Sequence, residues 1–158
     1  MDIGGTQVIA APRAEVWEAL NSPEVLKTCI PGCERIEADG DDRYKVTMVA
    51  AIGPIRARFL GTLTLTDVQP PTAYSLLFEG NGGVAGFGKG GASVSLADLP
   101  EGTSLSYTAQ AQVGGKLAQI GSRLIDTVAK KLAADFFRAF EKHFEARAAA
   151  GGDAVRAQ

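Results

Sequence analysis

Two cysteines and one histidine are the side chains of this chain most suited to metal, redox or acid–base chemistry. Cys29 and Cys33 form a C-x3-C pair, and His143 is the only histidine among 158 residues. A zinc site needs about four ligands at close spacing, and a redox pair usually separates its cysteines by two residues. His143 is far from both cysteines and has no acid–nucleophile arrangement near it. We therefore interpret the cysteines as structural residues flanking a turn and His143 as a partly exposed packing residue.

A glycine-rich segment, Gly86-Phe87-Gly88-Lys89-Gly90-Gly91, fits the G-x-G-x-x-G pattern. A dinucleotide fingerprint needs a strand before this pattern, a helix after it and an acid about 20 residues further on. A strand pattern follows instead, and Gly90 stands where a phosphate loop would carry Ser or Thr. We therefore interpret the segment as a bulged edge strand or a mobile flap, with Phe87 as its apolar tip.

Four other polar side chains are candidates for binding. Tyr74 and Tyr107 lie on the predicted inner face of the sheet, where each hydroxyl could donate a hydrogen bond to a ligand carbonyl or to the backbone. Arg56 and Arg58 alternate outward on one strand. The two arginines are interpreted as a solvated sheet face, with a patch that docks a partner as the alternative.

The composition is that of one globular domain, with 46% hydrophobic and 22% charged residues. A net charge of −2 gives no indication of nucleic-acid binding. No signal peptide and no apolar run of membrane-spanning length is visible, so a cytoplasmic location with reduced thiols is expected. We expect a single domain over residues 1–147 and a short flexible tail over residues 148–158.

Short segments of alternating polarity fill the middle of the chain and predict six to seven antiparallel strands. Residues 55–65 and 105–113, for example, place apolar side chains on one face and Thr, Ser, Gln or Arg on the other. Residues 3–10 are predicted as a first strand, followed by two short helices within residues 12–28. Ser22-Pro23-Glu24 gives the second helix an N-cap, a first-turn proline and a first-turn acid.

One long amphipathic helix is predicted from about Lys116 to Arg147. A helix of roughly 30 residues spans about 45 Å, so it must cross a whole sheet. Its apolar residues advance mostly by four positions, which turns the apolar stripe by about 40° at each step. Such a helix either faces first a cavity mouth and later a packed sheet, or follows a twisted sheet. The elements together indicate an α+β fold with a curved antiparallel sheet around this helix.

Two stretches carry a resemblance to a known family. The run from Ala11 to Leu26, APRAEVWEALNSPEVL, resembles the opening of the START-related, helix-grip (SRPBCC) superfamily. The continuation Cys29-Ile30-Pro31-Gly32-Cys33-Glu34 resembles CoxG, the family of the carbon monoxide dehydrogenase G subunit. So does the run from Gly114 to Ile125, GGKLAQIGSRLI, with Phe136-Phe137 downstream. The resemblance covers roughly residues 1–147.

The resemblance implies a non-catalytic accessory protein of a molybdenum hydroxylase of the carbon monoxide dehydrogenase type. It implies recruitment of that enzyme to the cytoplasmic membrane and an apolar cavity that carries a quinone-like or isoprenoid lipid as cargo, with no cofactor or metal of its own. We expect the hydrophobic ligand to contact Met48, Phe59, Leu63, Phe78, Phe87, Tyr107, Ala109, Ala111, Leu117, Ile120, Gly121, Leu124 and Ile125. Gly121 is expected to let ligand or sheet come close to the helix.

Two other functions are compatible with the same fold. A cyclase or hydrolase would need acids, bases or oriented polar groups inside the cavity, and the predicted inner face offers two tyrosines and no carboxylate. A protein-docking module without ligand would fill its cavity with its own side chains and expose an apolar patch. The glycine-rich segment and the phenylalanine-rich end of the helix are the candidate patches.

Overall fold

The computed structural model describes the backbone of residues 1–157 and the side chains of residues 1–147. The strands are β1 (Asp2–Ile9), β2 (Cys33–Ala38), β3 (Arg43–Ile52), β4 (Ile55–Gln69), β5 (Ala73–Asn81), β6 (Phe87–Leu99) and β7 (Gly102–Gly114). The helices are α1 (Arg13–Leu20), α2 (Pro23–Cys29), α3 (Lys116–Gln119) and α4 (Ser122–Ala157), with a 3₁₀ turn η1 (Gly83–Ala85).

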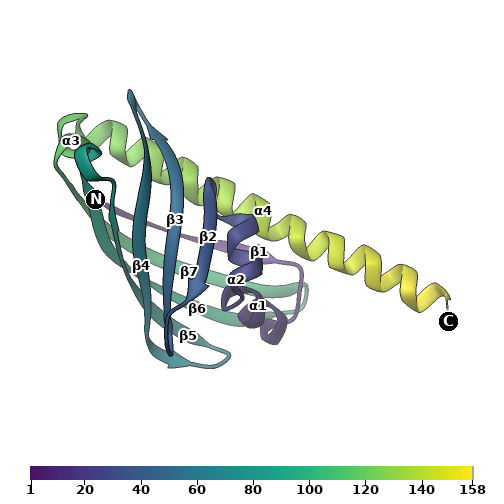
Figure 1. Cartoon of the computed structure of the whole chain (residues 1–158). Coiled ribbons are helices and arrows are strands. Elements are labelled where there is room, and N and C mark those ends of the chain that lie inside the picture. Colours follow the sequence, from purple (N-terminus) through teal and green to yellow (C-terminus); the bar gives the residue numbers. More distant parts are fainter. Residues whose placement is uncertain (158) are drawn as a thin grey trace.

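The seven strands form one antiparallel sheet in the order β1-β7-β6-β5-β4-β3-β2. The sheet curves around α4, which runs along its concave side and projects beyond it toward the C-terminus (Figure 1). The predicted α+β architecture, a curved sheet that grips a long C-terminal helix, is confirmed. The division into a domain and a tail at residue 147 stays a prediction.

The two short helices after the first strand are also confirmed. Pro23 occupies the first turn of α2, and the Ser22 hydroxyl accepts a hydrogen bond from the Val25 amide at 3.4 Å. This N-cap satisfies one of the amides that the first helical turn leaves without a partner. α2 packs against both β2 and α4, so this short helix covers one side of the long helix.

The hydrophobic core lies around the C-terminal half of α4. Phe140 is fully buried, and Phe137 and Phe144 are nearly so. These rings pack against residues from α1, α2 and the inner face of the sheet, namely Ile9, Val16, Ala19, Leu20, Cys29, Leu65, Tyr74, Leu96 and Leu105. Full burial of such side chains contributes roughly 1.5–3 kcal/mol each, so this end of the molecule is the best stabilised.

The glycine-rich segment lies in the middle of the sheet, because β6 pairs with both β5 and β7. The interpretation as a bulged edge strand is therefore wrong. Gly90 lies opposite Phe78 on β5, and Gly114 lies opposite Phe87 across the β6–β7 pair. A Cβ atom at either glycine would overlap the facing ring, so these glycines accommodate aromatic rings from the neighbouring strand.

The long helix is interrupted near its start, where the sequence pattern predicts a single helix. α3 ends at Gln119, α4 begins at Ser122, and Gly121 between them has a φ of +95°. L-residues rarely adopt this angle, whereas glycine does so without a steric penalty. A Cβ at Gly121 would meet nothing within 4 Å, so this glycine allows a change of direction and not a close approach. The apolar periodicity continues through the break and therefore gives no sign of it.

We predict that Gly121→Ala lowers the free energy of unfolding by about 1–2 kcal/mol, the cost of a left-handed conformation for an L-residue. Gly80→Ala is the matched control, because a Cβ there also meets nothing within 4 Å but Gly80 lies in a strand without a positive φ. The control is expected to be neutral or slightly stabilising. Urea denaturation measures both; equal effects of the two substitutions would contradict the explanation.

Candidate functional site

An apolar chamber of about 360 Å³ lies between the concave face of the sheet and the middle turns of α4. Its volume is at the lower end of the roughly 300–1,000 Å³ that is usual for small-molecule sites. The wall on the helix side consists of Ala129, Leu132, Ala133 and Phe136. These residues are spaced by three and four positions, so they form one face of the helix.

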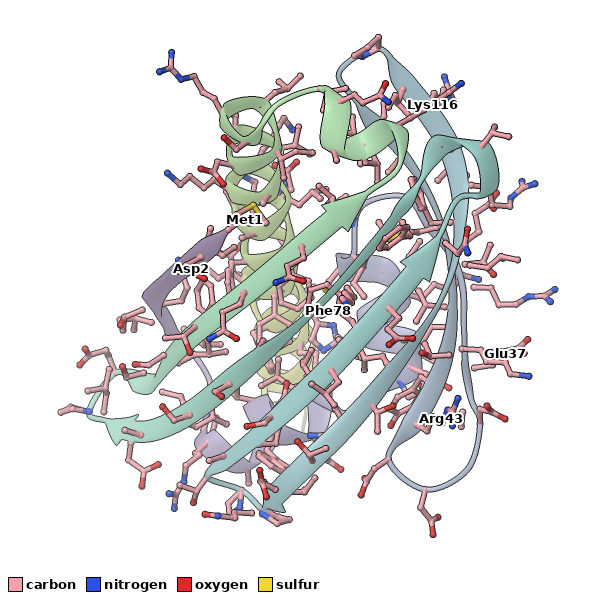
Figure 2. The ribbon with its side chains drawn as sticks, turned by 90° about the vertical axis from the view of Figure 1, so that its left-hand side faces the viewer. Met1, Asp2, Glu37, Arg43, Phe78 and Lys116 are labelled. Atoms are coloured by element: carbon pink, nitrogen blue, oxygen red, sulfur yellow. The ribbon has the colours of Figure 1, made fainter. Side chains whose placement is uncertain are left out.

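The wall on the sheet side comes from three strands. Met48 lies on β3, Phe78 on β5, and Ala109 and Ala111 on β7. Figure 2 shows Phe78 in the middle of the sheet, in front of α4. Because β7 and the facing turns of α4 both carry alanines here, the two surfaces leave space between them.

The remaining walls come from segments that sequence reasoning does not assign to the site. Met1 and Ile3 close the chamber at the β1 edge, and Ile30 and Pro31 close it between α2 and β2. Leu132 and Phe136 belong to the predicted apolar stripe of the helix, which is the available signal for them. Periodicity gives no information on Ile30 and Pro31, because they lie in an irregular turn.

Four of the thirteen predicted contact residues line the chamber: Met48, Phe78, Ala109 and Ala111. Five others gather at the end of the molecule where η1, α3 and the β3–β4 turn meet. Among these, Leu117 and Ile125 are buried, and a Cβ at Gly53 would touch the Leu124 side chain. Ile120 and Gly121 lie between them in the chain. These five residues close the space between sheet and helix at the end beyond the chamber, because the break at Gly121 places α3 against η1.

The last four predicted residues lie elsewhere on the sheet. The Phe59 ring covers Gly82, and Leu63 packs against the core. Phe87 is 46% exposed and lines an open groove on the convex face together with Leu60. Tyr107 stacks at 5.1 Å from Phe137 and borders a second cavity between β1 and α4.

The Cys-Ile-Pro-Gly-Cys-Glu segment forms one side of the chamber. Gly32 has a φ of +76° and lies against the Val49 carbonyl of β3, where a Cβ would collide. This close approach directs Ile30 and Pro31 into the chamber wall. Both cysteines are free, and burial raises the pKa of each thiol above its ordinary value, which lowers its reactivity. The interpretation as cysteines flanking a turn agrees with this geometry.

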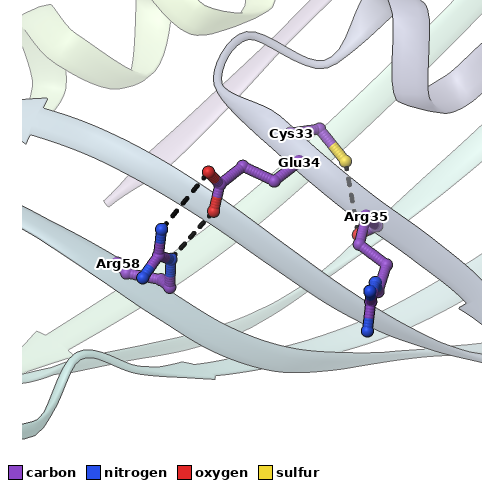
Figure 3. Close-up of polar contacts among 4 residues, drawn as sticks. All are labelled: Cys33, Glu34, Arg35 and Arg58. Carbon is purple, nitrogen blue, oxygen red and sulfur yellow. Dashed lines mark hydrogen bonds and ion pairs between the residues drawn. The ribbon is translucent and has the colours of Figure 1, made fainter.

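Glu34 occupies a β-bulge, since the register shifts between Cys33 and Arg35. Its carboxylate accepts two hydrogen bonds from Arg58 on β4, at 2.8 Å from Nε and 3.3 Å from Nη2 (Figure 3). The hydrogen bond from Arg58 lowers the pKa of the Glu34 carboxyl group. The pair is exposed, so it contributes little stability but ties β2 across β3 to β4.

The chamber holds no side chain for acid–base chemistry. None of its thirteen lining residues is Asp, Glu, His, Lys, Arg, Cys or Ser, and Gln110 is the only residue with a polar side chain. Gln110 alternates with Ala109 and Ala111 on β7, so its side chain lies on the convex face. The described residues contain no group of three or more His, Cys, Asp and Glu that could hold a metal ion.

His143 lies outside the chamber, in the core half of α4. Its ring packs edge-on against Phe144 at 5.1 Å, and Nε2 is buried with no hydrogen-bond partner among residues 1–147. This environment is that of a packing residue. No helix of the described chain is long and apolar enough to span a membrane.

Solved structures with the same fold come from several bacteria. A conserved protein from Geobacillus kaustophilus is 35% identical with a TM-score of 0.85, over 90% of this chain and 94% of that chain. A START superfamily protein from Mycobacterium smegmatis is 14% identical with a TM-score of 0.71, over 91% and 97% of the two chains.

An aromatase/cyclase from Streptomyces is also 14% identical, with a TM-score of 0.68 over 94% of this chain and 95% of that chain. Likeness at this level shows a common fold and does not transfer an activity. No curated protein matches the chain. The model of one protein family, the carbon monoxide dehydrogenase G subunit (CoxG), matches residues 5–144, so the chain belongs to the CoxG family.

Proposed function

We propose that this protein is a non-catalytic accessory protein that carries an apolar molecule, of the quinone or isoprenoid class, in the chamber between the sheet and α4. The observation that carries the proposal is the chamber itself, which is lined almost entirely by apolar side chains. The family description supports a molybdenum hydroxylase of the carbon monoxide dehydrogenase type as the protein partner.

Burial alone would hold such a ligand. At about 25 cal/mol per Å², covering some 300 Å² of apolar ligand surface contributes roughly 7 kcal/mol before ordering costs. A general acid or base acting on the ligand would have to reach into the chamber, and its lining side chains offer none. Carriage therefore fits the lining better than the cyclase-type chemistry named for the Streptomyces structure.

We propose a lipid surface as the second partner, because one end of the molecule combines exposed apolar side chains with basic ones. This basic tip consists of the β3–β4 turn, η1, α3 and the first turn of α4. Val84 is 86% exposed and Leu124 is 37% exposed at the tip. Lys116 and Arg123 lie in these segments and Arg56 lies at the start of β4, and none of the three forms an ion pair with another described residue.

The opposite end of the molecule is acidic. The β2–β3 turn contains Asp39, Asp41 and Asp42, Asp98 lies at the end of β6, and Glu101 lies in the β6–β7 turn. Asp39 and Asp98 form ion pairs with Arg43 and Arg13, and the other three acids form none with a described residue. Figure 2 shows Lys116 at one end and Arg43, which follows the acidic β2–β3 turn, toward the other. Although the net charge is −2, the molecule is thus polarised. An anionic bilayer attracts basic residues by about 1 kcal/mol each and would orient the basic tip toward it.

We expect Ala111→Trp to abolish ligand uptake while the protein stays folded, because the indole fills the chamber. Gln112→Trp is the matched control, since the adjacent position on β7 faces the convex side. Mass spectrometry of an organic extract of natively purified protein measures the bound lipid, and thermal shift with quinone analogues measures uptake. A clean wild-type extract without any shift, or equal loading of both variants, would contradict the carrier function and favour a docking module.

The double variant Lys116→Glu/Arg123→Glu should bind vesicles of anionic phosphatidylglycerol at least tenfold more weakly than wild type, because two charges are reversed and the net charge of the basic tip falls by four units. Lys27→Glu/Lys142→Glu makes the same charge change on α2 and the core half of α4 and should bind like wild type. Vesicle sedimentation at 50 and 300 mM salt measures both, and wild-type binding should fall with salt. An equal loss in the two double variants would show that net charge alone acts.

A further inference from the structure

A second cavity of about 370 Å³ lies beside the apolar chamber, between the edge strand β1 and α4. The inner face of β1 places Gln7 opposite Leu105 and Gly5 opposite Tyr107 on β7. Because β1 is an edge strand, no further strand of the described chain continues the sheet on this side, and α4 lies across it. Figure 2 shows Met1 and Asp2 at this edge of the sheet, next to the helix.

The cavity and the chamber are continuous in their lining. Both contain Ile3 of β1 and Ala133 of α4. Along the helix, the chamber is faced by Ala129 and Phe136, and the cavity by their neighbours Lys130 and Phe137. One residue corresponds to 100° on a helix, so the two spaces lie on adjacent faces of the same turns of α4.

The two spaces differ in chemistry. The chamber is apolar, whereas the lining of the side cavity includes Tyr107, Gln7 and Lys130, whose side chains carry a hydroxyl, an amide and an ammonium group. Among the described residues, no hydrogen bond or ion pair holds any of these three side chains. Stacking on Phe137 orients the Tyr107 ring, and a Cβ at Gly5 would lie 3.5 Å from its hydroxyl.

We propose that the β1–α4 cavity is the head-group subsite for an amphipathic ligand, whose apolar body occupies the chamber and whose polar head carries an acceptor oxygen. The Tyr107 hydroxyl and the Gln7 amide donate to that oxygen, and Lys130 adds a third donor at the outer rim. Asp2 borders the cavity as well, so its lining contains one acidic and one basic residue. Carbonyl and carboxylate heads share this chemistry. The inference rests on the chamber being a ligand site, as proposed above.

The experiment uses a fluorescent apolar probe without an acceptor head, N-phenyl-1-naphthylamine, and its displacement by 2-decanone and by decanoate. Tyr107→Phe and Gln7→Leu should each weaken displacement by 2-decanone about fivefold, the effect of one lost neutral hydrogen bond. Binding of the probe itself should stay unchanged in both variants. Tyr44→Phe is the matched control, because Tyr44 packs against the core and borders neither space.

Lys130→Gln separates the two head groups. If Lys130→Gln weakens displacement by decanoate and not by 2-decanone, the result supports a carboxylate head. If the wild-type protein binds 2-decanone more tightly than decanoate and Lys130→Gln changes neither, the result supports a carbonyl head. If Tyr107→Phe and Gln7→Leu bind the probe and release it to 2-decanone as the wild-type protein does, the subsite is overturned and the carrier function stands. Failure of the wild-type protein to bind the probe would overturn both.

Discussion

The burial of the phenylalanine-rich half of α4 is the interaction on which the rest of the structure depends. Phe140 is fully buried and stacks with Phe136 at 5.6 Å, while Phe144 packs edge-on against it at 5.1 Å. Large aromatic side chains bury roughly 150–250 Å² each, so this cluster fixes the position of the helix against the sheet. Leu117 and Ile125 hold the other end. The helix is thus packed tightly against the sheet at both ends and loosely between them, and the chamber is the space in the loosely packed part.

Small residues determine where the sheet and the helix do not meet. Alanines on β7 and on the facing turns of α4 leave the chamber open. The glycines make room for aromatic rings instead, because Gly90 and Gly114 lie under the rings of Phe78 and Phe87. The aromatic ring in each case supplies the apolar contact that a glycine in a strand lacks. The glycine-rich segment therefore builds the sheet and is not a phosphate loop.

Local patterns predict the elements well and the site only in part. Alternating polarity indicates the strands, and Ser22-Pro23 indicates the start of α2, because both are set by nearest neighbours in the sequence. The break at Gly121 escapes prediction, since a φ above zero leaves no trace in hydrophobic periodicity. The five predicted contacts on the helix, between Leu117 and Ile125, precede the helix residues that line the chamber, Ala129 to Phe136, by about three turns. The walls formed by Ile30 and Pro31 depend on how Gly32 meets β3, a tertiary contact that no local pattern encodes.

A chamber without charged side chains has a consequence for how a carrier would exchange its cargo. Apolar burial stabilises a ligand in the protein by roughly the free energy that the same burial provides in the hydrocarbon of a bilayer. Transfer between the two then changes the free energy little, whereas release into water loses the whole contribution. Exchange would therefore require contact between the protein and a membrane, and the polarised charge of the molecule would supply an orientation for it. On the proposed function, the chamber and the basic tip would be two parts of one device, because an apolar cargo site gains from a second apolar phase within reach.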